Sequence, residues 1–135
     1  MAETNLTVAD DTPTALVVRE VIEAGEPYQF TGERQLQERL AVALTSRFGD
    51  LVHREDRLND RMRIDFMVGG VGVEVKVKGA APTVARQLAA YAAHPAVDEL
   101  LLVSTVPAHI GVPAMTFVGG VGAAPDVLIL SGGAL

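Results

Sequence analysis

The sequence contains no cysteine, which excludes disulfide bonds, thiolate zinc sites and cysteine nucleophiles. Such a chain suits a reducing compartment, so we expect an intracellular, cytoplasmic protein. The longest stretch without a charged residue, from residue 100 to residue 125, is interrupted by Pro107, Pro113 and several glycines. A membrane-spanning helix needs about 20 consecutive apolar residues, so we expect no membrane segment. The N-terminus also lacks the basic region and apolar core of a signal peptide.

Motifs for several common chemistries are missing as well. Residues 120–125 lack the third glycine of a dinucleotide-binding fingerprint, and no glycine-rich loop ends in Gly-Lys-Ser or Gly-Lys-Thr. Ser104 lacks the surroundings of a nucleophile elbow. The histidines at 53, 94 and 109 do not have metal-ligand spacing, and we expect them on the surface or in loops.

The chain is acidic, with a net charge of −6, which by itself argues against a nucleic-acid partner. The acidity is concentrated in residues 1–30, which hold six acids and one base, whereas residues 31–135 hold eleven acids and ten bases. Six of these bases lie close in sequence to Asp65 and Glu74: Arg54, Arg57, Arg61, Arg63, Lys76 and Lys78. The local field around the two carboxylates is therefore less negative than the net charge indicates.

A chain of 135 residues has the size of a single domain with one core of two or three layers. We expect an acidic, partly ordered N-terminal extension over residues 1–30, loose over residues 1–12, and one domain over residues 31–135.

The hydrophobic pattern predicts both helices and strands. Apolar residues at helical spacing predict helices over residues 31–48, with Thr31 as N-cap, and 82–94. Residues 13–25 fit either a short helix or a strand. Strands are predicted on both sides of Gly69-Gly70 and over residues 51–56, 99–105, 115–118 and 127–130, with the 99–105 strand parallel to a neighbour because a helix precedes it. This order predicts an α/β (α+β) domain in which helices flank a mixed sheet.

Gly69-Gly70 separates two alternating runs, which is typical of a tight β-hairpin with positive φ at both glycines. In that register Asp65 lies directly opposite Glu74, with Cβ atoms about 5 Å apart. Two facing carboxylates repel each other unless a cation lies between them. We expect this sheet face to carry the chemistry of the hairpin, with Arg61, Arg63, Asp65, Met67, Gly72, Glu74, Lys76 and Lys78. The opposite face would be apolar, with Met62, Ile64, Phe66, Val68, Val71, Val73, Val75 and Val77.

An aspartate on one strand, Glu-x-Lys on the next and a helix on either side resemble the PD-(D/E)xK nuclease superfamily. Ile64-Asp65 stands in the place of Pro-Asp, and Glu74-Val75-Lys76 in the place of Glu-x-Lys. The proline before Asp65 is missing, and Met62 stands where RecB-like members often carry glycine. The resemblance covers about residues 31–105 and implies a three-layer, restriction-endonuclease-like core.

Two helical motifs extend the resemblance. Gln87 and Tyr91 match the Gln-x-x-x-Tyr motif of the RecB-like branch. Glu33 resembles the acidic residue in the opening helix of Holliday junction resolvases of the archaeal type. It lies on the same helical stripe as Leu36 and Leu40, so we expect it to point toward the sheet.

The resemblance implies a metal-dependent deoxyribonuclease of DNA repair, recombination or a mobile element, acting as a homodimer. Mg²⁺ or Mn²⁺ would be held by Asp65 and Glu74, with Glu33 as an outer or second-metal ligand and the Val75 carbonyl as a further ligand. Lys76 would position the attacking water or neutralise charge at phosphorus. The remaining candidates are Gln87 and Tyr91, which would brace the site or touch the DNA backbone, and the phosphate contacts Arg54, Arg57, Arg61, Arg63 and Lys78.

Other interpretations of the same residues stay open. Asp65 and Glu74 also fit an edge pair relieved by Arg63 and Lys76, which would contribute little stability. Glu33 also fits a first-turn acid favoured by the helix dipole. The alternative function is a non-catalytic α/β interaction or structural module with the same fold. The sequence does not indicate which DNA structure would be cleaved.

Overall fold

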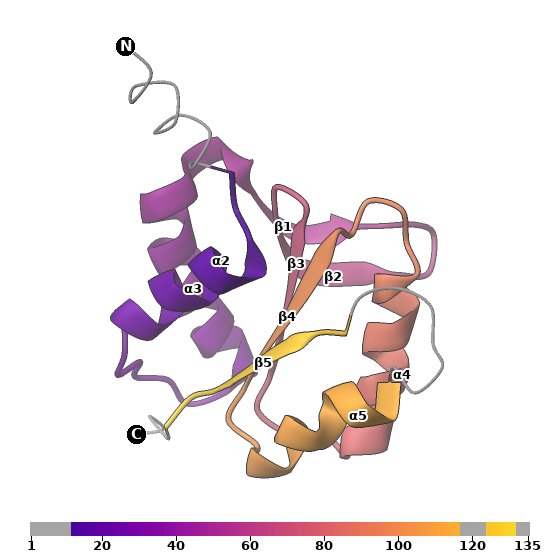
Figure 1. The fold of residues 1–135 in the computed structure, drawn as a ribbon. Helices are drawn as coiled ribbons and strands as arrows, with labels where there is room; N and C mark the ends of the chain where they lie inside the picture. Colours follow the sequence, from indigo (N-terminus) through magenta and orange to yellow (C-terminus); the bar gives the residue numbers. More distant parts are fainter. Residues whose placement is uncertain (1–11, 117–123, 132–135) are drawn as a thin grey trace.

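The computed structural model describes residues 12–116 and 124–131, and it has three layers (Figure 1). A five-stranded sheet forms the middle layer. Helices α2 (Ala15–Ala24) and α3 (Glu33–Phe48) cover one face, and α4 (Ala81–Ala92) and the short α5 (Val112–Thr116) cover the other. The predicted α/β fold, a mixed sheet flanked by helices, is confirmed.

The strands follow one another across the sheet in sequence order. The first three are antiparallel neighbours, whereas the third, fourth and fifth run parallel. Because parallel neighbours need a crossover, α4 connects the third strand to the fourth, as the sequence predicted. The strands are β1 (Val52–Arg57), β2 (Arg63–Val68), β3 (Val71–Lys76), β4 (Glu99–Ser104) and β5 (Asp126–Ile129).

The helices agree with the sequence pattern within two residues, except at one cap. Gly32, not Thr31, is the N-cap of α3, and the Thr31 amide instead donates to Oε1 of Gln35 at 2.7 Å. The ambiguous segment 13–25 forms helix α2, capped by Thr14, whose Oγ1 accepts from the amide of Val17 at 3.2 Å.

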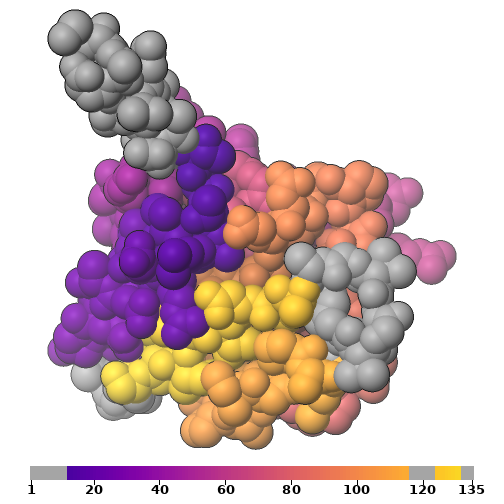
Figure 2. Space-filling model, viewed as in Figure 1, coloured from indigo at the N-terminus to yellow at the C-terminus, as the bar shows by residue number. Residues whose placement is uncertain are grey.

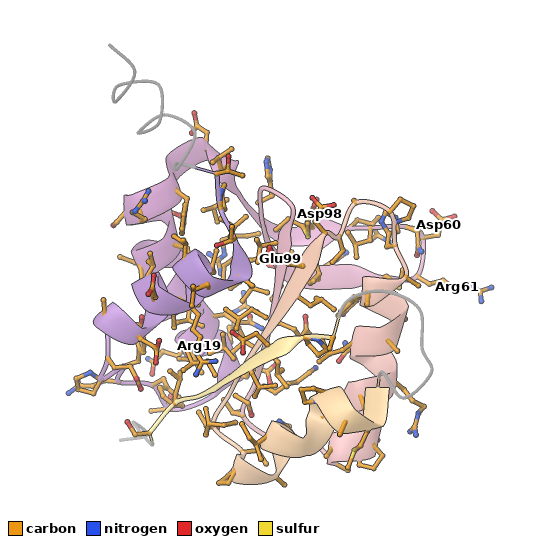
Figure 3. The ribbon with its side chains drawn as sticks, viewed as in Figure 1. Arg19, Asp60, Arg61, Asp98 and Glu99 are labelled. Carbon is orange, nitrogen blue, oxygen red and sulfur yellow. The ribbon has the colours of Figure 1, made fainter. Side chains whose placement is uncertain are left out.

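Helix α2 belongs to the core of the domain. Val18 and Ile22 are fully buried in the same cluster as residues of α3 and of the sheet. Arg19 reaches from α2 to β5 and lies 2.8 Å from Oδ1 of Asp126 (Figure 3). Figure 2 shows the two elements side by side on one surface. The core therefore crosses the boundary expected at residue 30, while residues 1–11 lie outside the described part of the chain.

One predicted strand is wrong. Residues 115 and 116 form the end of helix α5, which follows the 3₁₀ helix η2 (Pro107–Gly111), and residues 117 and 118 lie outside the described residues. A short apolar run does not by itself distinguish strand from helix. Pro113 in the first turn favours a helix start. Within the described ranges, no helix has the length and apolar character needed to cross a membrane.

The hairpin between β2 and β3 has the predicted register next to its turn, with Phe66 opposite Val73 and Val68 opposite Val71. The ladder ends at Phe66 and Val73, so the predicted direct pairing of Asp65 with Glu74 is not part of it. Of the two glycines in this turn, only Gly69 has positive φ, at 59°. The turn therefore resembles type II′ and lacks the positive φ expected at both glycines.

The predicted division of the hairpin into a polar and an apolar face is wrong. Phe66 packs with α2 and α3, whereas Ile64 and Met67 pack beneath α4. Residues two apart in a regular strand share a face, so the alternation breaks at Asp65. The break also shows in β1, where Glu55 has a φ of 48° and the regular pairing of β1 with β2 is interrupted. Both faces of the sheet are covered, and Asp65 lies where the alternation of β2 breaks.

Candidate active site

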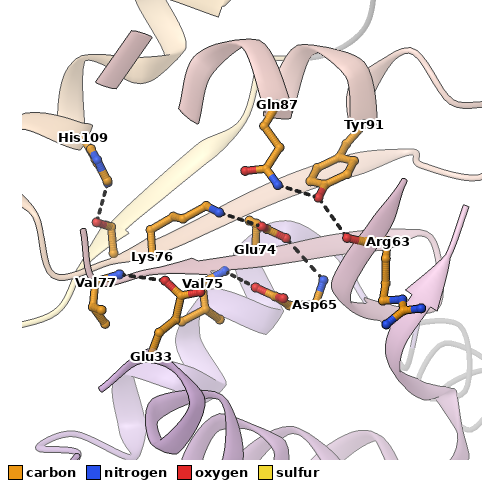
Figure 4. A network of polar contacts seen from close by, with 11 residues as sticks. Glu33, Arg63, Asp65, Glu74, Val75, Lys76, Val77, Gln87, Tyr91 and His109 are labelled. Atoms are coloured by element: carbon orange, nitrogen blue, oxygen red, sulfur yellow. Dashed lines mark hydrogen bonds and ion pairs between the residues drawn. The ribbon is translucent and has the colours of Figure 1, made fainter. Parts of the chain in front are cut away.

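The candidate site lies where β2 and β3 separate, at the open end of the hairpin (Figure 4). The backbone ladder ends at Phe66 and Val73, and beyond it side chains replace the missing partners. The amide of Val75 donates to Oδ2 of Asp65 at 2.8 Å, and the amide of Asp65 donates to Oε1 of Glu74 at 3.3 Å. The two carboxylates are thus held by the backbone of both strands.

Glu74 is nearly completely buried, with 3% of its surface exposed. Its Oε2 lies 3.2 Å from Nζ of Lys76, which comes from the same face of the same strand. One oxygen of the Glu74 carboxylate therefore faces the amide of Asp65, and the other faces an ammonium group. The structure brings Asp65, Glu74 and Lys76 together as the sequence predicted.

Both carboxyl groups hold their protons more tightly than usual. Burial, followed by the negative charge of Asp65, raises the pKa of Glu74 to about 8 even though Lys76 opposes the shift. The pKa of Asp65 is also raised, again chiefly by burial, with a smaller contribution from Glu33. Burial and mutual repulsion are the two causes that disfavour the charged forms. A cation between the groups would remove much of this cost.

Glu33, at the start of α3, points toward the open end of the hairpin. Its Oε1 accepts from the amide of Val77 at 3.2 Å, and its charge acts on Asp65. The predicted direction, toward the sheet, is confirmed. A hollow of about 510 Å³ at the start of α3 is lined in part by Glu33 and Arg34, which brings solvent to this side of the site.

Gln87 and Tyr91 connect α4 to β2. Nε2 of Gln87 donates to the hydroxyl of Tyr91 at 2.9 Å, and this hydroxyl donates to the carbonyl of Arg63 at 2.9 Å. Arg63 lies two residues before Asp65, so the pair fixes the backbone that carries the carboxylate. Tyr91 is itself 3% exposed, and burial followed by the charge of Glu74 raises its pKa. Of the two roles expected for these residues, the geometry fits the brace.

The predicted DNA contacts are dispersed. Lys78 is exposed just after β3, and Arg61 projects from the β1–β2 loop (Figure 3). Arg57 donates to the carbonyl of Asp60 at 3.3 Å, and Arg63 lies 3.7 Å from Glu55.

Arg54 differs from the other four basic residues. Both its terminal nitrogens contact Glu38, at 2.8 and 3.3 Å, and its guanidinium lies 5.9 Å from the ring centre of Phe66. Of the five basic residues predicted as phosphate contacts, Arg54 is the least suited to that role, because two hydrogen bonds to Glu38 already engage its guanidinium.

The donor set can be tested against a hard divalent cation. Such ions prefer carboxylate and carbonyl oxygens. Asp65 and Glu74 supply two carboxylates, and burial makes the charged form of each unfavourable unless a cation lies nearby. The Val75 carbonyl points to the same side of β3 as the Val75 amide, which bonds Asp65, because a strand residue directs both groups to one neighbour. Among the described residues no three acidic or histidine side chains cluster to hold an ion. Two carboxylates and one carbonyl are oxygen ligands of the kind that such an ion prefers, and Glu33 lies beside them without completing a three-acid cluster among the described residues.

One buried polar pair was not expected. Ser104 and His109 are both fully buried, and His109 Nδ1 lies 2.7 Å from Ser104 Oγ. The prediction that His109 lies at the surface or in a loop is wrong, because the residue is buried within η2. A single histidine between proline and glycine residues carries no periodic signal that would reveal its burial. His53 is exposed, as expected.

Comparison with known proteins gives no independent guide to the family. The chain matches no family model, no curated protein and no solved structure. The functional argument therefore depends on the chemistry of the site.

Proposed function

We propose that the protein is a metal-dependent deoxyribonuclease that hydrolyses phosphodiester bonds at the open end of the β2–β3 hairpin. The observation that supports this most is the convergence of Asp65, Glu74 and Lys76. A carboxylate pair with a raised pKa beside a lysine is costly for a structural role. Perturbed pKa values of this kind gather at functional sites.

Bound Mg²⁺ or Mn²⁺ would supply Lewis acidity at the phosphate and a more acidic water. Asp65 and Glu74 would hold the ion, joined by the Val75 carbonyl. Asp65 keeps its direction because its carboxylate accepts from the Val75 amide. Tyr91 and Gln87 keep the β2 backbone in place from the other side.

Lys76 is the residue nearest the carboxylate pair that carries positive charge and movable protons. Its ammonium would orient the attacking water and offset the negative charge that develops at phosphorus. Water forms the new bond to phosphorus, the bond to the sugar oxygen breaks, and the proton lost by the water is balanced by one gained at that oxygen.

The substrate side of the proposal is DNA, contacted through Lys78, Arg57, Arg61 and Arg63 at the open end of the sheet. Repair, recombination or a mobile element is the setting that we propose for this activity, in the cytoplasm. The resemblance to PD-(D/E)xK nucleases supports the proposal, since Glu33, Gln87 and Tyr91 lie beside the carboxylates in the structure. A homodimer stays a prediction. Ile110 and Met115 are exposed apolar residues. Substituting them with serine and measuring the molar mass by size-exclusion chromatography with light scattering tests whether they contribute to a dimer interface.

The alternative is a binding module that keeps the fold without catalysis. One contact favours it, because Glu33 is already engaged by the Val77 amide. A carboxylate accepts several hydrogen bonds, so this contact does not remove Glu33 from the site.

Cleavage assays separate the two functions. Supercoiled, linear and four-way-junction DNA are incubated with the protein in Mg²⁺, in Mn²⁺ and in chelator, beside Asp65→Asn and Lys76→Ala. Asp50→Asn is the matched control, since Asp50 is exposed in η1 (Gly49–Leu51). Metal-dependent cleavage that is lost in both site variants and kept in the control supports the nuclease. Equal cleavage by the variants would contradict the site, and no cleavage of any substrate would favour the binding module.

A further inference from the structure

The buried pair of Ser104 and His109 lies behind the candidate site and has no part in the chemistry proposed above. Ser104 ends β4, next to Lys76 in the parallel pairing with β3. His109 lies in η2, and its Nε2 lies 2.7 Å from the carbonyl oxygen of Gly79. The imidazole of His109 thus connects the end of β4 to the segment that follows β3.

The hydrogen bonds fix the state of the ring. A carbonyl oxygen only accepts, so Nε2 of His109 carries the hydrogen toward Gly79. With the hydrogen on Nε2, Nδ1 is the acceptor for the Ser104 hydroxyl, whose Oγ lies 2.7 Å away. Oγ of Ser104 also accepts from the amide of Val106 at 2.9 Å. Every polar atom of the pair has a partner.

A serine beside a histidine also suggests a nucleophile, but burial argues against this role. Both residues are 0% exposed, so a substrate has no access to Ser104 Oγ. The pair therefore acts on the backbone that it holds.

That backbone is the connection between the two halves of the candidate site. Residues 77–80 join Lys76, the last residue of β3, to α4, which carries Gln87 and Tyr91. The connection is held at three points. The carbonyl of Lys76 accepts from the Thr105 amide at 3.1 Å, the amide of Val77 donates to Glu33, and the carbonyl of Gly79 accepts from His109.

Gly79 is the point at which the chain turns from strand to helix. Its φ of 111° is one that residues with a side chain rarely adopt. The next residue, Ala80, is the N-cap of α4 without a side-chain cap, and its carbonyl accepts from the amides of Thr83 and Val84. The hydrogen bond from His109 therefore holds the residue directly before the N-cap of α4.

We propose that His109 is a positioning residue that sets Lys76 and α4 in their places relative to each other. The proposal rests on the proposed nuclease function for its catalytic readout. Through Gly79, His109 fixes the end of β3 and the start of α4, and so the distance between Lys76 and the Gln87–Tyr91 brace. Displacement of a catalytic group by about 1 Å can lower a rate by about 100-fold.

The test compares two substitutions of His109 with a matched histidine. His109→Leu removes both hydrogen bonds, whereas His109→Gln keeps one donor and one acceptor at the end of the side chain. His94→Leu is the control, because His94 also accepts from a backbone amide, that of Ala96 at 3.1 Å, in the loop after α4. Each variant is assayed for DNA cleavage, for unfolding and for amide hydrogen exchange at Val77, Thr83 and Val84.

We expect His109→Leu to lower kcat about 10- to 100-fold with KM within about threefold of the wild type. The amides of Val77, Thr83 and Val84 exchange faster in it. His109→Gln restores kcat to within about threefold, and His94→Leu leaves both measurements unchanged. Wild-type kcat in His109→Leu would overturn the proposal, as would a loss that His109→Gln does not rescue.

The exchange measurement keeps this test separate from the proposed function. If the wild-type protein cleaves no DNA, the nuclease proposal fails, but the exchange rates still report on the connection. Unchanged protection of the three amides in folded His109→Leu would then overturn the positioning role, and faster exchange confined to them would support it.

Discussion

Lys76 and Glu74 form an ion pair within one strand, with Nζ 3.2 Å from Oε2. Residues two apart on a strand project from the same face, and the exposed fractions of the two side chains are 19% and 4%. Lys76 therefore lies against one of the two carboxylates that would hold the cation in the proposed mechanism.

The raised pKa of Glu74 predicts a distinct dependence of stability on pH. Between its ordinary value of 4.5 and about 8, the folded protein keeps a proton that the unfolded chain releases. The folded state then binds more protons, so the free energy of unfolding falls as pH rises through this window. Above about pH 8, Glu74 is ionised in both states and no longer changes the free energy of unfolding with pH.

Urea unfolding in chelator at pH 5 and pH 8 measures the effect. Glu74→Gln should gain about 1–3 kcal/mol relative to the wild type between the two pH values, well under the full linkage because the groups are coupled. Glu38→Gln is the control, because Arg54 lowers the pKa of Glu38 and its window lies below pH 4.5. A gap between wild type and Glu74→Gln that stays constant with pH would contradict the account.

Tyr91→Phe should separate bracing from general stability. The substitution removes the hydroxyl that joins Gln87 to the Arg63 carbonyl, which costs about 1–2 kcal/mol. Tyr28→Phe is a close match, since the Tyr28 hydroxyl donates to the Ile22 carbonyl in the core under α2. We expect both variants to lose similar stability by thermal unfolding. Cleavage should fall about 10-fold only in Tyr91→Phe, and an equal fall in both would assign Tyr91 a purely structural role.

Glu33 can be tested by separating its hydrogen bond from its charge. Glu33→Gln keeps an acceptor for the Val77 amide, whereas Glu33→Ala removes it. Because the proposal gives Glu33 a part in cation binding, isothermal titration with Mn²⁺ should show weaker affinity in both variants, by about 10-fold or more. The unfolding free energy should fall mainly in Glu33→Ala. If Glu33→Gln binds Mn²⁺ as tightly as the wild type, the charge of Glu33 has no part in cation binding, and its role is limited to the hydrogen bond with the Val77 amide.

The two kinds of arginine near the site predict different responses to salt. Arg61→Ala should lower DNA affinity and reduce the slope of log K against log salt concentration by about 1, because Arg61 projects from the β1–β2 loop. Arg54→Ala should change the slope little, because Glu38 already neutralises Arg54. Fluorescence anisotropy with a labelled duplex in Ca²⁺ between low and moderate salt measures both slopes. Equal slope changes would show that the Arg54–Glu38 pair opens on DNA.

Much of the fold follows from local patterns in the sequence. Gly69-Gly70 determined the hairpin register, and apolar spacing located α3 and α4 within two residues. These features depend on residues that are neighbours along the chain. The meeting of Asp65 with Glu74 could be predicted for the same reason, because one turn sets both positions.

The remaining features depend on contacts between distant segments. Ile64 and Phe66 lie on opposite faces because side-chain carboxylates replace backbone hydrogen-bond partners at Asp65. The alternation of residue types along the strand gives no sign of this break. Burial of His109 requires Gly79, 30 residues earlier, to present its carbonyl. Residue 115 was predicted to lie in a strand, because a short apolar run does not distinguish a strand from a helix. In the structure it belongs to helix α5, with Pro113 in the first turn.

The central claim is that Lys76 acts in catalysis beside a cation site made by Asp65 and Glu74. Single-turnover cleavage of a labelled DNA in Mn²⁺, with Mn²⁺ affinity measured on the same samples, tests it most directly. Lys76→Ala should bind Mn²⁺ at least as tightly as the wild type, because Lys76 competes for Glu74, yet cleave at least about 1,000-fold more slowly. Cleavage at the wild-type rate by Lys76→Ala with bound Mn²⁺ would contradict the claim.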